Sequence, residues 1–272
     1  MALIQKERPE LVINAAGLTG KPSVDACESQ KAECLEANVQ LPAVLHRACR
    51  DTGVPFAHIS SGCIFSGRRE DGEGFREDDV PNFSFRQNNC SFYSGSKALG
   101  EEALGYGAVR QADGSLKWQT ESPDCWIWRL RMPFSEEREP RNYLSKVLSY
   151  ERLLDVENSL VHFRDFVGAG LQLFERGAEF GIYNLVNPGA VTTRRVIELA
   201  KLEGAATSEQ EYRFFRSEAE FMESAPLVPR SSCVLSAEKT EAAGVELRPL
   251  ETALREALAE RVGRTPVKRQ YV

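Results

Sequence analysis

Short apolar runs alternate along the chain with longer segments in which apolar residues recur every three or four positions. The apolar runs predict buried strands over residues 11–14, 56–59, 126–130 and 181–186. The helical spacing predicts helices over residues 24–50, 93–104, 142–150, 167–174, 192–202 and 250–262. Because nearly continuous apolar strands alternate with helices, the pattern predicts an α/β fold with a parallel sheet covered on both faces.

A polar segment over residues 66–91 is expected to be a long loop, and such loops in compact domains are usually functional. Of 272 residues, 42% are hydrophobic and 27% are charged, which is typical of a soluble globular protein. The formal net charge is −6, with acids and bases interspersed. This balance argues against nucleic acid or an anionic membrane as the main partner.

Cysteine and histidine usage narrows the class further. The seven cysteines contain no CxxC pair, so we expect reduced intracellular thiols and not a disulfide framework. The three histidines stand far apart, and local spacing predicts no zinc site. No stretch reaches the length of a membrane span, and the N-terminus lacks the apolar core of a signal peptide. We therefore expect a cytoplasmic, metal-free protein.

Two strand ends carry candidate ligand-binding residues. Asn14-Ala15-Ala16-Gly17 ends the first predicted strand with small side chains that let a flat ligand approach the backbone closely. Ser60 and Ser61 end the second, where the ligands of open parallel sheets bind, so a serine hydroxyl there can donate to a substrate carbonyl. The alternatives are an ordinary turn at the first end and a serine that only satisfies loop backbone at the second.

The third candidate is the pair Tyr93 and Lys97, four residues apart on a predicted helix. Positions i and i+4 share one helix face, so the phenol and the ammonium can share a site. We expect the cation to lower the pKa of the tyrosine, which can then give a proton to a carbonyl oxygen. Gly95 lies inside this motif and weakens the helix, and a lone Tyr-x-x-x-Lys is more often a surface pair.

The order of these features changes their weight. A small-residue strand end, a serine strand end and then Tyr93-x-x-x-Lys97 resemble the short-chain dehydrogenase/reductase superfamily. The segment Arg129-Leu130-Arg131-Met132-Pro133 ends the next strand, where members of that superfamily contact the nicotinamide. The resemblance implies an oxidoreductase with a Rossmann-type parallel sheet that uses NADPH or NADH.

Within that superfamily the chain resembles the extended, RmlD-like branch of dTDP-4-dehydrorhamnose reductases. It looks most similar to the nucleotide-rhamnose synthase/epimerase-reductase enzymes of plants, and the likeness spans almost the whole chain. The segments that carry it include residues 14–22, 24–29, 62–65, 75–83, 92–94, 129–133, 140–146, 183–189 and 229–231. This resemblance implies NAD(P)H-dependent reduction of a nucleotide-linked 4-keto-6-deoxy sugar with 3,5-epimerisation, giving dTDP- or UDP-L-rhamnose-type products.

The resemblance implies catalytic roles for the residues of this chain that match the family's motif positions. Tyr93 is expected to be the proton donor, Lys97 its partner and Ser61 the hydroxyl that orients the carbonyl, although close relatives have threonine there. Epimerisation in this family involves a cysteine and a lysine, which match Cys63 and Lys146. Read without the family, these two are a buried strand-end thiol and a solvated helix lysine.

The remaining predicted contacts concern the cofactor and the substrate. Asn142 and Arg230, with Ser61, are expected to bind the nucleotide sugar, because an amide and a guanidinium suit phosphate oxygens. The residues expected to bind the cofactor are Asn14, Ala15, Ala16, Gly17, Asn38, Tyr93, Lys97, Met132 and Pro133.

The family pattern also predicts the domain organisation. We expect a partial dinucleotide-binding domain over 1–134, rejoined by 160–187, and a substrate-binding subdomain formed by 135–159 and 188–272. The family begins with a glycine-rich strand–turn–helix that binds pyrophosphate, whereas Gly17 is the first glycine of this chain. On that pattern about 60 residues are expected to be absent, so the Rossmann sheet is expected to be incomplete.

Three explanations stay open for the expected absence of the glycine-rich segment. It is encoded upstream, a homodimer partner or another chain supplies it, or the chain is a decayed paralogue. Two other functions also stay open. One is 4-reductase activity alone, with epimerisation by a separate protein. The other is a non-catalytic binding or regulatory protein on the same scaffold, against which the intact Ser61, Tyr93 and Lys97 weigh.

Overall fold

The computed structural model describes residues 1–224 and 227–264. Its centre is a four-stranded parallel sheet in the order β1-β2-β5-β10. The strands are β1 (Val12–Asn14), β2 (Phe56–Ser61), β5 (Trp126–Leu130) and β10 (Gly181–Asn184). Each of the four apolar runs thus forms a strand, and the predicted α/β fold with a parallel sheet is confirmed.

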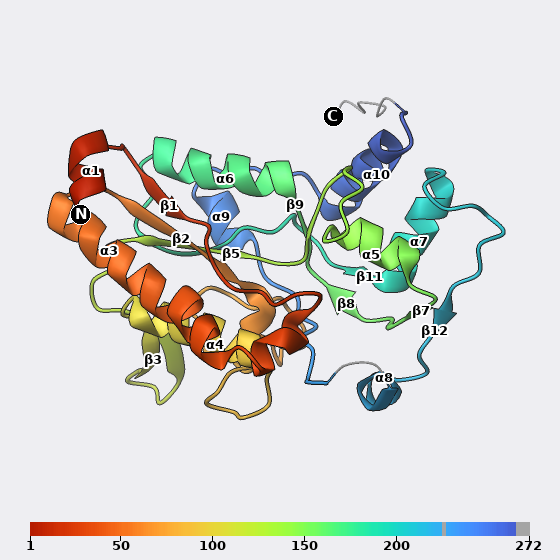
Figure 1. Cartoon of the computed structure of the whole chain (residues 1–272), viewed down its shortest axis with the longest axis horizontal. Coiled ribbons are helices and arrows are strands. Elements are labelled where there is room, and N and C mark those ends of the chain that lie inside the picture. Colours follow the sequence, from red (N-terminus) through yellow and green to blue (C-terminus); the bar gives the residue numbers. More distant parts are fainter. Residues whose placement is uncertain (225–226, 265–272) are drawn as a thin grey trace.

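Helices cover both faces of this sheet (Figure 1). Helix α6 (Phe163–Glu175) packs on one face against Trp126, Trp128 and Tyr183. Helices α3 (Leu41–Thr52) and α4 (Phe92–Ala103) lie on the other face, where Ile127 is fully buried. Residues 126–128 therefore place alternate side chains in two cores, and both cores are apolar because both faces are covered.

The predicted helix over 24–50 is interrupted in the structure. The chain forms a 3₁₀ helix η1 (Val24–Glu28), helix α2 (Lys31–Leu35), a π-helical turn η2 (Glu36–Gln40) and then α3. The π turn ends just before Pro42, which has no N–H to donate to the carbonyl of Asn38. A Cβ on Gly100 of α4 would lie 2.3 Å from that carbonyl oxygen, so glycine lets α4 approach this turn.

A second core lies at the other end of the molecule, on the right in Figure 1. Helices α5 (Tyr143–Ser149), α7 (Thr193–Leu202) and α10 (Leu250–Arg261) form it. Short strand pairs flank it: β6 (Pro133–Phe134) with β9 (Val161–His162), β8 (Glu157–Asn158) with β11 (Val191–Thr192), and β7 (Arg152–Leu153) with β12 (Arg213–Phe214). This separate core agrees with a distinct C-terminal subdomain, and its exact boundaries stay a prediction.

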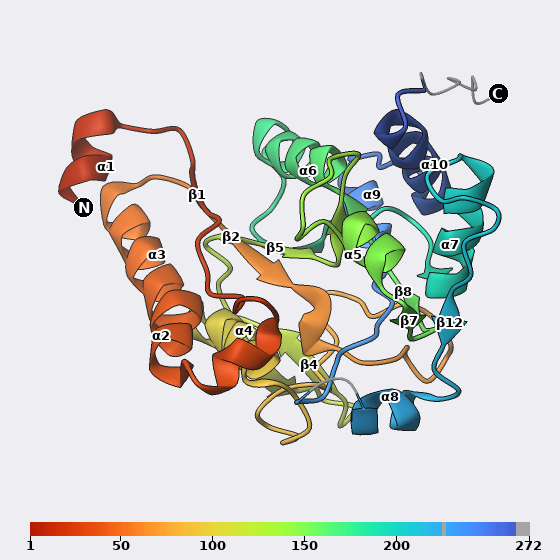
Figure 2. The same cartoon turned by 45° about the vertical axis from the view of Figure 1, so that its right-hand side comes forward.

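The remaining elements are short: α1 (Ala2–Glu7), η3 (Gly62–Ile64), the hairpin β3 (Gly107–Arg110) and β4 (Leu116–Gln119), α8 (Glu218–Ser224) and α9 (Glu238–Ala242). In the described part of the chain, no helix combines the length and the apolar character needed to cross a membrane. In Figure 2 the segment after β1 lies beside α4, and α5 lies on the other side of the strand ends. The carboxyl ends of β1 and β2 therefore open between the two cores.

Candidate active site at the carboxyl ends of the strands

Helix α4, which carries Tyr93 and Lys97, is positioned by local interactions that the sequence encodes. The Ser91 hydroxyl caps it by accepting a hydrogen bond from the backbone N–H of Ser94 at 3.2 Å. A Cβ on Gly95 would lie 2.2 Å from ring carbons of Phe85, so glycine at this position leaves room for the polar loop to pack on α4. This contact explains a glycine that otherwise weakens the helix.

The structure brings Ser61, Tyr93 and Lys97 together. The Ser61 side chain, at the end of β2, forms a hydrogen bond with Tyr93. The Lys97 Nζ donates to the carbonyl oxygen of Ile59 at 2.9 Å, one turn further along α4. The three polar groups converge on one strand end from two elements, as the spacing predicts.

The expected lowering of the pKa of Tyr93 is not found. Burial raises this pKa above its ordinary value, and the hydrogen bond from Ser61 offsets only part of that rise. Burial also lowers the pKa of Lys97. Desolvation dominates because both groups lie between α4 and the sheet, where a charge loses its hydration. Tyr93 is therefore a neutral phenol, which is the form that holds a proton to donate.

A cleft with an empty volume of about 1000 Å³ opens beside Tyr93 and Lys97, whereas Ser61 and Cys63 are not among the residues that line it. Its floor includes Ile59, Leu130 and Pro133. Small residues from the end of β1, Tyr93 and Lys97 line one side. Of the predicted cofactor-binding residues, those that line the cleft are Ala15, Ala16, Gly17, Asn38, Tyr93, Lys97 and Pro133. The cleft is apolar at the strand ends, as a flat aromatic ring requires.

Asn14 and Met132 do not line the cleft, and the side chain of Asn38, which does, is engaged in hydrogen bonds to the protein. The Asn14 side chain accepts from the backbone of Ala16 and contacts His58. The Asn38 side chain clamps Leu18 by accepting from its N–H and donating to its carbonyl, each at 2.9 Å. Met132 packs against the C-terminal core. These residues shape the loops around the cleft, and their contact with a cofactor stays a prediction.

Cys63 lies just behind Ser61 in η3. Its thiol is hydrogen-bonded to the side chains of Ser61 and Ser94. Burial raises the pKa of this thiol, and the positive charges of Arg131 and Lys97 partly oppose that rise. Cys63 is thus a protonated, buried thiol next to the site, which suits an acid more than a base.

Lys146 reaches the cleft from α5, on the side opposite to α4. It is half-buried, and burial together with the nearby charge of Arg141 lowers its pKa. A lysine with a lowered pKa is easier to use as a base.

Asn142 and Arg230 make protein contacts in this structure. Asn142 caps α5, and its amide donates to the carbonyls of Ser135 at 2.7 Å and Glu137 at 2.6 Å. The Arg230 guanidinium forms an ion pair with Asp25 at 2.5 Å, which ties the C-terminal part to η1. Both are absent from the residues that line the cleft, and their roles in substrate binding stay predictions.

Arg141 is the residue that the sequence analysis missed. It lines the cleft, and its guanidinium donates to the carbonyl of Gly20 at 2.9 Å. A neighbouring hollow formed by residues 17–21 with Gln30 also includes Arg141. The signal was available, because Arg141 directly precedes the predicted phosphate ligand Asn142. Arg141 and Lys146 therefore both face the cleft.

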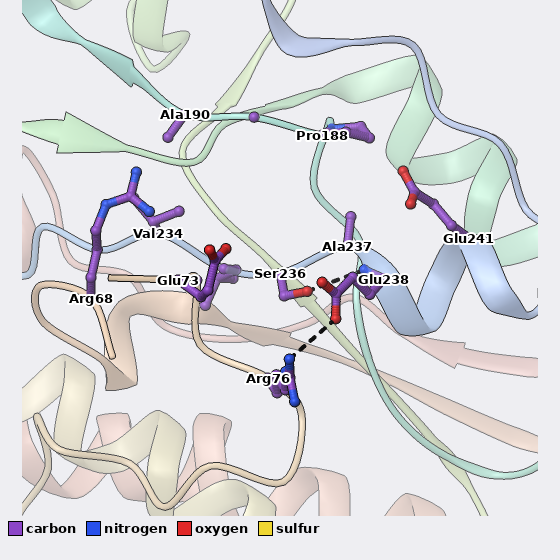
Figure 3. Close-up of a pocket in the computed structure, with 13 residues that line it drawn as sticks. Arg68, Glu73, Arg76, Pro188, Ala190, Val234, Ser236, Ala237, Glu238 and Glu241 are labelled. Atoms are coloured by element: carbon purple, nitrogen blue, oxygen red, sulfur yellow. Dashed lines mark hydrogen bonds and ion pairs between the residues drawn. The ribbon is translucent and has the colours of Figure 1, made fainter. Parts of the chain in front are cut away.

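A second cavity of about 640 Å³ lies elsewhere, between the polar loop and the N-terminal end of α9 (Figure 3). Its wall is charged, and Arg76 forms an ion pair with Glu238 there at 3.6 Å. It contains none of the predicted site residues. A separate group of possible metal ligands combines His46 of α3 with Asp124 and Cys125, which directly precede β5, at the opposite end of the strands from Ser61.

The profile of the RmlD substrate binding domain family matches residues 1–155. The chain belongs to this family. A relative in Arabidopsis thaliana, named bifunctional dTDP-4-dehydrorhamnose 3,5-epimerase/dTDP-4-dehydrorhamnose reductase, is 36% identical over 73% of this chain. A trifunctional UDP-glucose 4,6-dehydratase/3,5-epimerase/UDP-4-keto-L-rhamnose-reductase of the same plant is 33% identical over 72% of this chain.

The matched region spans only part of these relatives, 61% of the bifunctional protein and 27% of the trifunctional one. The solved UDP-rhamnose synthase of Acanthamoeba polyphaga mimivirus has 22% identity and a TM-score of 0.80, covering 95% of this chain and 85% of that one. A dTDP-4-dehydrorhamnose reductase from Bacillus anthracis, solved with NADP, has 17% sequence identity and a TM-score of 0.71. The match covers 96% of this chain and 83% of that one. Both structures share the fold of this RmlD-family chain.

Proposed function

We propose that this RmlD-family chain reduces a nucleotide-linked 4-keto-6-deoxy sugar with NAD(P)H and epimerises it at C3 and C5. The observation that carries the proposal is the convergence of Ser61, Tyr93 and Lys97 on one strand end beside the cleft. The names of the Arabidopsis relatives support the reaction and the substrate class. The chemistry of the site supports the same reaction independently of those names.

Tyr93 acts as the proton donor in this proposal. Its raised pKa keeps the phenol protonated, and Ser61 holds both the phenol and the substrate carbonyl by hydrogen bonds. The O–H bond of Tyr93 breaks as the new O–H bond forms at C4 of the sugar. The charge left on the phenol oxygen is stabilised by the ammonium of Lys97.

The cleft fits the nicotinamide half of a dinucleotide. Ala15, Ala16 and Gly17 offer little side chain, Ile59 and Pro133 give an apolar surface, and Lys97 can bind a ribose hydroxyl. The cofactor supplies the hydride that the protein itself lacks.

Cys63 and Lys146 are proposed as the epimerisation pair. The C4 ketone acidifies the neighbouring C–H bonds, so one base removes the proton and an acid on the opposite face returns it. Lys146, with its lowered pKa, suits the base, and the protonated thiol of Cys63 suits the acid. Arg141 adds positive charge for a diphosphate.

The test adds NADPH and a nucleotide 4-keto-6-deoxy sugar to the chain. Cofactor binding is measured first by NADPH fluorescence. Consumption of NADPH by the wild type, and at least a thousandfold less by Tyr93→Phe, is expected because only the proton donor is lost, on the order of general acid catalysis. Bound NADPH that is not consumed with either dTDP or UDP sugars would refute the reaction.

Reduction without epimerisation is the second candidate. Cys63 is not among the residues that line the cleft, and this placement favours the second candidate. This candidate predicts NADPH consumption only after a separate 3,5-epimerase is added. Consumption of the unepimerised sugar without that addition would exclude it.

Three further expectations belong to the same proposal. We propose a cytoplasmic location and a nucleotide-sugar substrate in place of nucleic acid. A homodimer, or a partner that supplies further cofactor-binding residues, is also proposed. β1 is the edge strand of the central sheet within the described residues, and a further strand could pair there. Light scattering after gel filtration tests the dimer.

A further inference from the structure

His58 lies under the catalytic lysine and has no role in the reaction described above. It is in the middle of β2 and is fully buried. Its Nδ1 lies 3.1 Å from the Asn14 Nδ2, and its Nε2 lies 3.5 Å from the Lys97 Nζ. The imidazole therefore bridges the end of β1 and the catalytic helix.

The donors and acceptors of this chain of contacts can be assigned. The backbone N–H of Ala16 can only donate, and it points to the Asn14 Oδ1 at 3.1 Å. The other end of the Asn14 amide, the NH₂ group, must then face His58. The His58 Nδ1 is consequently the acceptor, and a neutral imidazole carries its hydrogen on Nε2.

The Nε2–H group of His58 is aimed at a lysine without a counter-ion. Lys97 is 5% exposed, and no carboxylate in residues 1–224 or 227–264 forms an ion pair with it. Its Nζ already donates to the Ile59 carbonyl. An ammonium can only donate hydrogen bonds, so its N–H groups would be repelled by the N–H of the imidazole. A neutral amine has a lone pair that can accept the imidazole hydrogen.

We propose that His58 is a positioning residue that presents an N–H donor to Lys97 and thereby favours the neutral amine over the ammonium. This inference deepens the proposed function and rests on it for its consequence in catalysis. The His58 ring itself stays neutral, because burial and the neighbouring lysine lower its pKa well below the ordinary value.

Three other groups around Lys97 raise its pKa, and burial lowers it. The thiols of Cys63 and Cys34 and the carboxylate of Glu101 favour the ammonium. The Glu101 carboxylate already pairs with a buried guanidinium, and burial raises the pKa of the Cys63 thiol, so little free negative charge remains. Burial accordingly dominates, and the pKa of Lys97 is lowered.

The consequence concerns the pH dependence of reduction. Of the two forms of Lys97, only the ammonium stabilises the charge that forms on Tyr93. Reduction should therefore decline as pH rises through the pKa of Lys97, at a lower pH than an ordinary lysine would give. Without the N–H of His58, this decline should move to higher pH.

The competing arrangement is the other tautomer. The backbone of Asn14 also interacts with the ring, and its carbonyl can accept from a hydrogen on Nδ1. The Nε2 would then accept from an ammonium, and His58 would favour the charged lysine. That tautomer forces the Asn14 NH₂ to face an N–H group, so we favour the first.

The experiment is nitrogen NMR of the full chain labelled at histidine and lysine, without cofactor or sugar. The chain has three histidines, so His46→Asn and His162→Asn assign the remaining signal to His58. We expect hydrogen on Nε2 of His58. His58→Asn keeps a polar group near Asn14 and removes Nε2, and we expect the pKa of Lys97 to rise by about one unit or more.

His58→Gln keeps more of the side-chain volume and can turn its carbonyl oxygen to Lys97, so the same rise is expected. His46→Asn lies at the other end of the sheet and should leave the pKa of Lys97 unchanged. Hydrogen on Nδ1, or a Lys97 pKa that is equal in wild type and both His58 variants, overturns the proposal. Because no substrate is present, a failed reduction assay would contradict the proposed function and leave this inference standing.

Discussion

Removing the carboxylate of Glu101 should destabilise the fold more than any exposed charge change. Glu101 and Arg129 form an ion pair at 2.7 Å, and both side chains are fully buried. Glu101 also accepts hydrogen bonds from the Ser60 hydroxyl at 2.7 Å and the Trp118 indole at 3.0 Å. One carboxylate thus ties α4 to β2, β4 and β5.

The magnitude follows from what Glu101→Ala leaves behind. The Arg129 guanidinium stays buried without its counter-ion, which costs about 3–5 kcal/mol when one partner of a buried pair is removed. The unpaired donors of Ser60 and Trp118 are part of the same loss and are not added separately, because the four bonds share one acceptor. A loss of about 3–5 kcal/mol is a large share of the stability of an ordinary domain, about 5–15 kcal/mol.

The neighbouring Glu102 provides a matched control on the same helix. It pairs with Arg86 at 2.8 Å, but the Arg86 side chain is 54% exposed. Exposed pairs contribute about 0–1 kcal/mol, so Glu102→Ala should cost less than about 1 kcal/mol. Urea unfolding followed by tryptophan fluorescence measures both free energies of unfolding. Equal losses for Glu101→Ala and Glu102→Ala would refute the reasoning, whereas Glu101→Leu combined with Arg129→Met should recover part of the stability.

Further predictions concern the helix and the epimerisation pair. Gly95→Ala should lower stability by about 1–3 kcal/mol because its Cβ would overlap the Phe85 ring. Gly168→Ala on α6, where nothing lies within 4 Å, should instead raise stability by up to about 1 kcal/mol, and urea unfolding measures both changes. Cys63→Ala and Lys146→Met should each spare reduction of an already epimerised sugar, measured as NADPH consumption, and abolish inversion at C3 and C5 of the unepimerised one, seen by NMR of the product. A parallel loss of both activities would contradict the division of roles.

The central sheet could be predicted because its strands are buried on both faces. Their apolar runs need no tertiary information, and the four expected strands are all present. The hairpin β3–β4 was not predicted, although Asp113-Gly114 marks its turn and Gly114 has a φ of +87°. Both its strands are short and largely exposed, so they lack the apolar alternation that the analysis relied on.

The candidate site was predictable in its residue types and less so in its electrostatics. The spacing of Tyr93 and Lys97 fixed their common helix face, but their pKa values depend on burial against β2. His58 on β2 contacts both Asn14 on β1 and Lys97 on α4, and it forms no local sequence motif with either residue. Contacts between distant segments of this kind follow from packing and have no signal in the sequence of one chain.

Transfer of deuterium from NADPH deuterated at the nicotinamide C4 tests the central claim most directly. We expect the wild-type chain to place deuterium on C4 of the nucleotide-linked sugar, seen by NMR of the product, and Tyr93→Phe to place none. Deuterium at another carbon, or an equal amount in the Tyr93→Phe product, would contradict the account.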